Sequence, residues 1–107
     1  MAIKQYQIFL VNLEPTIGSE IKKTRPCLVV SPDEMNKYLK TIVIAPLTTS
    51  IKSYPTRFSI SLNKKKGQVA LDQIRTIDKK RIVKKMGVLN KSEVKECKSI
   101  LREIFVD

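Results

Sequence analysis

The chain has 107 residues, 42% hydrophobic and 29% charged, which fits one compact domain over residues 1–107 and provides enough apolar material for a core. Lys and Arg number 21 against 10 acidic residues, and this net charge of +11 indicates either a polyanionic partner, such as nucleic acid or an anionic membrane surface, or a merely solvated cationic surface. The chain contains no histidine, which excludes Ser-His and Cys-His catalytic pairs.

Short strands are expected first along the chain. The continuous apolar run that begins at Cys27 indicates a strand buried on both faces, and alternation of apolar and polar residues marks a later strand. The predicted strands are Gln7–Leu13, Cys27–Ser31, Thr41–Leu47, Thr56–Leu62, Gln68–Gln73 and Ile82–Val88. The predicted connections are a polar loop, a helical turn and a hairpin turn, at Glu14–Thr24, Asp33–Tyr38 and Lys64–Gly67.

The last segment predicts an amphipathic helix. Asn90 is the expected N-cap, and Glu93 follows three residues later as its capping-box partner. The apolar residues then recur at helical spacing on one stripe, with Ile100 beside it: Val94, Cys97, Leu101, Ile104 and Phe105. About six short strands and one packed helix predict an α+β, mostly β domain, closed as a small SH3-like β-barrel.

The two cysteines and the apolar segments indicate the cellular compartment in which the protein is expected. Cys27 and Cys97 lie in apolar patterns and not at metal-ligand spacing, so we expect buried, reduced side chains in a cytoplasmic protein. The start of the chain does not read as a secretory signal, and no stretch approaches the ~20 apolar residues of a membrane span. Neither a metal site nor a membrane partner is expected.

A cationic loop leads into the buried strand at Cys27. Lys22, Lys23 and Arg25 cluster just before Pro26, whose ring favours an extended conformation for the preceding arginine. A guanidinium held at a strand entrance can bind a phosphate with two parallel hydrogen bonds. The alternative is a surface arginine paired with Glu20.

Two later segments carry further polar groups at strand ends. Thr48, Thr49 and Ser50 follow a buried strand, where their hydroxyls either hold phosphate oxygens or satisfy the backbone of a turn. Asp72 and Arg75 flank another strand end, and Asp72 is either a general base or a structural acceptor for loop amides. After them, Asp78 is expected to cap a short basic turn formed by Lys79, Lys80 and Arg81.

Taken together, the three segments resemble MazF/PemK toxins over nearly the whole chain. The residues that carry the resemblance are Gly18, Glu20, Arg25 and Pro26 with the VVS that follows, then PLTTSI, then the block from Asp72 to Asp78. The resemblance implies an endoribonuclease that acts on single-stranded mRNA as a homodimer, without metal or other cofactor. It implies attack of the RNA 2′-hydroxyl on phosphorus, which leaves a 2′,3′-cyclic phosphate and a 5′-hydroxyl. It also implies an acidic antitoxin protein as partner.

In MazF proper, the residues matching Arg25 and Thr48 are regarded as the catalytic pair. In the Kid/PemK branch the histidine, arginine and aspartate candidates fall here on Ser19, Ala70 and Asp72, so the MazF type is favoured. A guanidinium cannot accept a proton at neutral pH, which leaves Glu20 and Asp72 as candidate bases. The expected RNA contacts are Lys22, Lys23, Thr49, Ser50, Tyr54, Arg75, Lys79 and Lys80.

Two other functions are compatible with such a fold. A CcdB-like gyrase poison would act through the end of its last helix, which here reads REIFVD and lacks tryptophan. A plain nucleic-acid-binding module would need stacking aromatics, and aromatics make up only 6% of the chain. The candidates for stacking are Tyr38, Tyr54 and Phe58.

Overall fold

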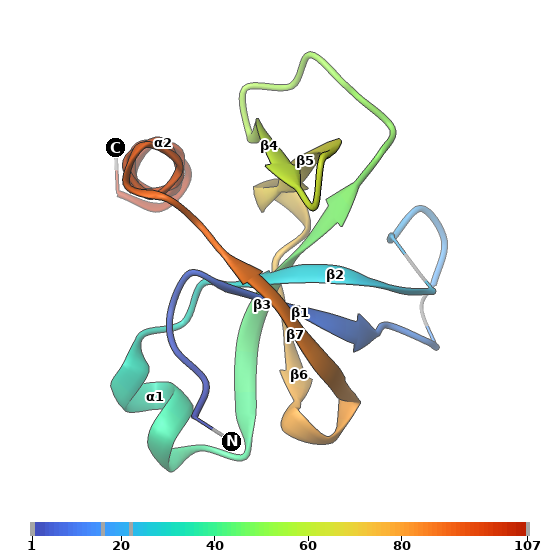
Figure 1. Ribbon diagram of the computed structural model, residues 1–107, viewed down its shortest axis with the longest axis vertical. Coiled ribbons are helices and arrows are strands. Elements are labelled where there is room, and N and C mark those ends of the chain that lie inside the picture. Colours follow the sequence, from blue (N-terminus) through green and yellow to red (C-terminus); the bar gives the residue numbers. More distant parts are fainter. Residues whose placement is uncertain (1, 16, 22, 107) are drawn as a thin grey trace.

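The computed structural model describes residues 2–15, 17–21 and 23–106 (Figure 1). Its strands and helices are, in chain order, β1 (Gln7–Asn12), β2 (Thr24–Val29), α1 (Asp33–Tyr38), β3 (Thr41–Thr48), β4 (Arg57–Leu62), β5 (Lys65–Ala70), β6 (Arg75–Asp78), β7 (Ile82–Val88) and α2 (Lys91–Phe105). Two short 3₁₀ turns, η1 (Leu71–Gln73) and η2 (Lys79–Arg81), flank β6. The predicted mostly β fold with a C-terminal helix is confirmed.

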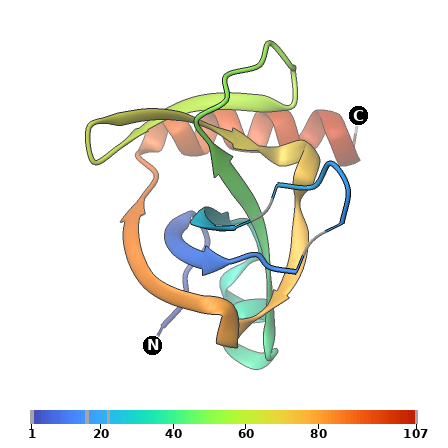
Figure 2. The ribbon, with the colours of Figure 1, turned by 90° about the vertical axis from the view of Figure 1, so that its right-hand side faces the viewer.

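The strands form an antiparallel sheet organised around β3. The order is β4-β5-β3-β2-β1-β7, and β6 pairs with β3 beside this path. The first half of β3 pairs with β6, whereas its last two residues, Leu47 and Thr48, pair with β5. Because β3 passes from one part of the sheet to the other, the sheet curls strongly around it (Figures 1 and 2).

The core consists of two apolar clusters on opposite faces of the central strands. In β1, Ile8 belongs to one cluster and Phe9 to the other, as the two-residue period of a strand requires. The first cluster includes Phe58 of β4 and Cys97 of α2, so α2 packs against the β4–β5 part of the sheet (Figure 2). Burial on both faces explains the continuous apolar run of β2.

The predicted capping box of α2 is confirmed, since Asn90 and Glu93 exchange side-chain to backbone hydrogen bonds. Cys97 is buried, and Val94, Ile100 and Leu101 pack beside it. The stripe is shorter than predicted because Ile104 and Phe105 lie at the exposed end of the helix.

Several strand boundaries differ from the prediction. β2 begins three residues earlier and ends at Val29, and β5 runs over Lys65–Ala70 rather than Gln68–Gln73. The hairpin turn between β4 and β5 consists of Asn63 and Lys64, both with positive φ, so the basic residues after it belong to a strand. β6 was not predicted as a strand.

Candidate active site

Arg25 and Thr48 meet where β2 begins and β3 ends. Both line a hollow with a volume of about 490 Å³. The other lining residues give it an apolar floor and a cationic rim: Pro26, Leu47, Thr49, Ile60, Leu62, Asn63, Lys65, Lys66, Gly67 and Met86. The antiparallel register, in which Cys27 lies opposite Pro46, brings the two strand ends together although they are far apart in sequence.

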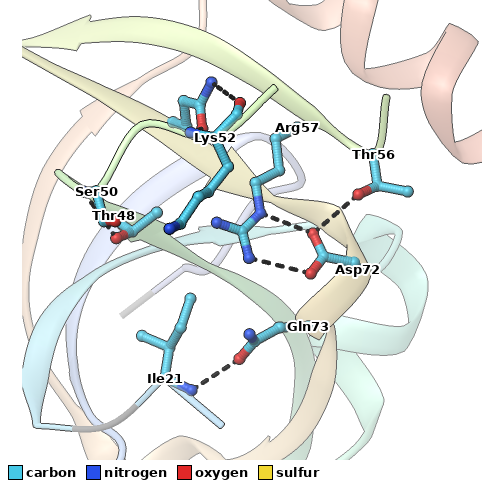
Figure 3. A network of polar contacts seen from close by, with 9 residues as sticks. Ile21, Thr48, Ser50, Lys52, Thr56, Arg57, Asp72 and Gln73 are labelled. Carbon is cyan, nitrogen blue, oxygen red and sulfur yellow. Dashed lines mark hydrogen bonds and ion pairs between the residues drawn. The ribbon is translucent and has the colours of Figure 1, made fainter. Parts of the chain in front are cut away.

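The side chains of Arg25 and Thr48 are each held by the backbone at the end of β3. Arg25 is half-buried, and its Nη1 donates a hydrogen bond of 3.3 Å to the carbonyl oxygen of Leu47. Thr48 is nearly buried, and its Oγ1 accepts the amide of Ser50 at 3.1 Å (Figure 3). The Thr48 hydroxyl therefore satisfies a turn and lines the hollow at the same time.

A second hollow of about 370 Å³ lies beside Pro46, close to the end of β3. It is lined by Ser19, Glu20, Ile21, Pro46, Asp72, Gln73, Ile74 and Arg75. From β3, Pro46 lines this hollow, whereas Leu47 and Thr48 line the first. Three of the predicted site residues, Glu20, Asp72 and Arg75, line it together.

Buried Cys27 lies within electrostatic range of one arginine from each hollow. Burial raises the pKa of its thiol to about 12, while the positive charges of Arg25 and Arg75 act in the opposite direction. Both arginines are therefore within electrostatic range of the same thiol. Arg75 also donates from Nη1 to the carbonyl oxygen of Leu13 at 3.4 Å, which fixes it beside the β1 end.

The two candidate bases have different surroundings. Glu20 is exposed, and its carboxylate accepts the amide of Ile17 at 2.9 Å. Asp72 receives Nε and Nη2 of Arg57 at 3.0 and 3.1 Å, together with the hydroxyl of Thr56 at 3.0 Å (Figure 3). The hydrogen bonds from Arg57 hold the pKa of Asp72 below its usual value, which makes this carboxylate a poorer proton acceptor.

The loop between β3 and β4 is fixed along its length. Gln68, which is buried on β5, accepts the amide of Lys52 at 2.9 Å and donates to its carbonyl oxygen at 3.0 Å. At the end of the loop, the amide of Arg57 donates to the carbonyl oxygen of Tyr54 at 3.1 Å. Thr49, Ser50 and Tyr54 are exposed on this loop, next to the two hollows.

Other predicted RNA contacts lie farther away. Asp78 pairs with Thr41, seven residues before the end of β3, so the η2 turn with Lys79 and Lys80 lies roughly 20 Å from Thr48 along the strand. The predicted cap of this turn by Asp78 is confirmed. Lys79 Nζ donates to the carbonyl oxygen of Asn36. Lys23 is exposed at the start of β2, and Lys22 lies outside the described residues.

The sequence interpretation missed Arg57 and Met86, and it placed Lys65 and Lys66 in a turn, as part of a diffuse positive field and not in the lining of a hollow. Arg57 lies two residues after Pro55 at the start of a strand, where no spacing distinguishes it from other basic residues. Phe58, in contrast, was wrong as a stacking candidate because its side chain is buried in the core. Tyr38 and Tyr54 are exposed.

Within the described ranges, no group of three or more His, Cys, Asp or Glu side chains is arranged to hold a metal ion. Over the same residues, no helix is long and apolar enough to cross a membrane.

A family model that matches almost the whole chain places it among the toxins of type II toxin-antitoxin systems. The chain belongs to the family described as PemK-like, MazF-like toxin of type II toxin-antitoxin system, whose family model matches residues 4–105. It is 32% identical over 105 residues to endoribonuclease MazF of Staphylococcus epidermidis, with 92% of this chain and 88% of the relative covered.

Solved structures agree on the fold. MazF (form I) from Deinococcus radiodurans superposes with a TM-score of 0.86 at 23% identity, covering 97% of this chain and 96% of that one. An endoribonuclease from a mycobacterial species, solved in complex with its cognate antitoxin, gives a TM-score of 0.81 at 21% identity and covers 95% of this chain and 93% of that one.

Proposed function

We propose that this protein is a cytoplasmic, single-domain toxin that cuts single-stranded mRNA at specific sequences without a metal ion. The observation that carries the proposal is the meeting of Arg25 and Thr48 in one hollow with a cationic rim. Family membership and the named activity of the staphylococcal relative support an endoribonuclease over a gyrase poison.

In the proposed reaction the RNA 2′-oxygen attacks the adjacent phosphorus and the 5′-oxygen of the next nucleotide leaves. The products are a 2′,3′-cyclic phosphate and a 5′-hydroxyl. The phosphorane formed on the way carries additional negative charge, and a donor aimed at such charge contributes about 3–4 kcal/mol. In this proposal Arg25 supplies this stabilisation and protonates the leaving 5′-oxygen, while Thr48 positions a nonbridging oxygen.

Glu20 is the better candidate for the base that takes the proton of the 2′-hydroxyl. Its carboxylate is exposed and makes one hydrogen bond to a backbone amide, whereas both oxygens of Asp72 are occupied by Arg57. Arg75 lies in the same hollow as Glu20 and binds phosphate in this proposal.

Around this centre, the exposed groups of two loops, Lys23, Thr49, Ser50 and Tyr54, contact the RNA strand. Lys79 and Lys80 act at a distance, as part of the positive field that attracts the phosphate backbone.

We also propose two protein partners. One is an acidic antitoxin that covers the basic surface and blocks RNA, as the complexes among the structural neighbours suggest. The other is a second copy of the chain, related by a two-fold axis, because Phe105 and Val106 leave an apolar surface exposed at the end of α2. Sedimentation of a 12.2 kDa species at micromolar concentration would contradict the homodimer.

The test of the proposed function is incubation of purified protein with a long single-stranded RNA in excess EDTA. We expect cleavage at a small set of sequences, with 2′,3′-cyclic ends. Activity that is lost in EDTA and restored by magnesium or manganese would contradict the metal-independent mechanism, and intact RNA under all conditions would contradict the nuclease itself.

A further inference from the structure

The charge of Arg57 is paired with a carboxylate of the same chain. Its side chain is only 7% exposed, and two of its nitrogens donate to the two oxygens of Asp72 at 3.0 and 3.1 Å. Such a two-point pair fixes the plane of the guanidinium. The pair is electrically neutral, so Arg57 does not present its charge to an RNA phosphate.

The same guanidinium lies over an aromatic ring. Its central carbon lies 4.9 Å from the centroid of the Tyr54 ring, within the range of a cation–π contact. Arg57 thus donates two hydrogen bonds to Asp72 and at the same time contacts the ring of Tyr54. The Tyr54 residue nevertheless remains 50% exposed, so part of the ring is open to solvent.

The backbone of the loop that carries Tyr54 is held by hydrogen bonds at Lys52 and at Tyr54 itself. Gln68 clamps the backbone at Lys52, and the Arg57 amide holds the carbonyl oxygen of Tyr54. Figure 3 shows the hydrogen-bonded Lys52 and the side chain of Arg57 in one view with Thr48. A preorganised aromatic side chain loses little conformational freedom on binding, which favours contact with a ligand.

We propose that Tyr54 stacks on an unpaired base of the RNA, and that Arg57 and Asp72 are positioning residues that hold its ring for this contact. Asp72 is then a structural acceptor and not the general base. The inference rests on the proposed function, because it assigns to the RNA substrate a contact on the loop that follows Thr48. Stacking suits a single-stranded partner, since its bases are unpaired and expose their faces.

Binding measurements test this inference separately from cleavage. The probe is a short RNA carrying 2′-O-methyl groups throughout, which removes the attacking hydroxyl, and fluorescence anisotropy reports its affinity. Loss of one base stack weakens binding by about 5- to 150-fold, and we expect Tyr54→Ala to fall in this range while Tyr54→Phe stays near the parent. The slope of log affinity against log salt should not change, because the ring is uncharged.

A matched control is Tyr38→Ala. Tyr38 is also exposed and lies 5.3 Å from the cation of Lys37, but it belongs to α1, away from β4 and β5 (Figure 1). Its removal should leave the affinity unchanged. A series of probes, each lacking one base, should contain one position at which Tyr54→Ala no longer weakens binding.

Variants of Arg57 and Asp72, the two residues proposed to hold the Tyr54 ring, complete the test. Arg57→Met and Asp72→Asn should weaken binding through the same stack, so combining either with Tyr54→Ala should add little. If Arg57→Met does not fold, Asp72→Asn and the base-deletion series still decide. Parental affinity in Tyr54→Ala would overturn the stacking contact. Parental affinity in Asp72→Asn with a slower bound cleavage rate would restore Asp72 as the base, and a parent that binds no RNA would overturn the proposed function as well.

Discussion

Replacing Asp72 with asparagine tests how strongly the Arg57–Asp72 pair stabilises the fold. Asparagine keeps one acceptor but loses the charge and the second acceptor, while the Arg57 side chain stays only 7% exposed. Hydrogen bonds to charged groups contribute about 1.5–3 kcal/mol each, and partial exposure of Asp72 reduces the penalty below that of a fully buried pair. We expect a loss of about 2–3 kcal/mol at pH 7, which lowers Tm by about 10–20 °C.

The pH dependence of this loss follows from the lowered pKa of Asp72. Because the folded pKa lies below the unfolded one, the stabilisation is complete above about pH 4, the ordinary aspartate value, and disappears as the pH falls through the folded pKa. Urea unfolding of parent and variant at one protein concentration should therefore give curves that differ at pH 7 and approach each other as the pH falls through the lowered pKa of Asp72.

A second aspartate provides the control. Asp33 lies 4.0 Å from Lys4, and both side chains are more than half exposed. Asp33→Asn should cost less than about 0.5 kcal/mol, because exposed ion pairs contribute little. Equal effects of the two substitutions, or an Asp72→Asn gap that persists unchanged at low pH, would refute the reasoning.

Three further predictions concern the site and the core. In Gly67→Ala the new Cβ would lie 3.2 Å from the carbonyl oxygen of Thr48, the last residue of β3, so this backbone must shift. We expect about tenfold slower cleavage, and cleavage at the parental rate would contradict the effect of this close approach. Cys27, with its pKa raised to about 12, should react with iodoacetamide at pH 8 only after unfolding, and rapid labelling of the native protein would contradict its burial. Lys65→Ala should reduce the slope of log RNA affinity against log salt concentration by about 0.7, and Lys79→Ala should reduce it by clearly less. Equal slopes for the two variants would contradict the placement of Lys65 at the hollow and of Lys79 far from it.

The sequence was most informative where local chemistry decides the structure. The capping box of α2 and the Asp78 cap depend on residues two or three positions apart, and both were predictable from spacing. The apolar run of β2 also indicated its burial correctly. These features need no knowledge of the rest of the chain.

The sequence-based predictions failed where the pairing of one strand with another determines the structure. β5 contains Lys65 and Lys66, which read as a turn, but the tight Asn63–Lys64 turn places them opposite β4 in a hairpin. β6 is a four-residue strand that owes its existence to β3. Arg57 reaches Asp72 because it lies opposite Ala70 in the β4–β5 register, and this contact joins residues 15 positions apart.

The most direct test of the central claim is single-turnover cleavage by Arg25→Ala at saturating enzyme. If Arg25 stabilises charge that exists only in the transition state, the bound cleavage rate should fall by about a hundredfold or more, with a much smaller loss of RNA affinity. Arg102→Ala, which removes an exposed arginine from α2, should leave both quantities near the parental values. Parental cleavage by saturated Arg25→Ala would show that Arg25 is only a binding charge and would contradict the account.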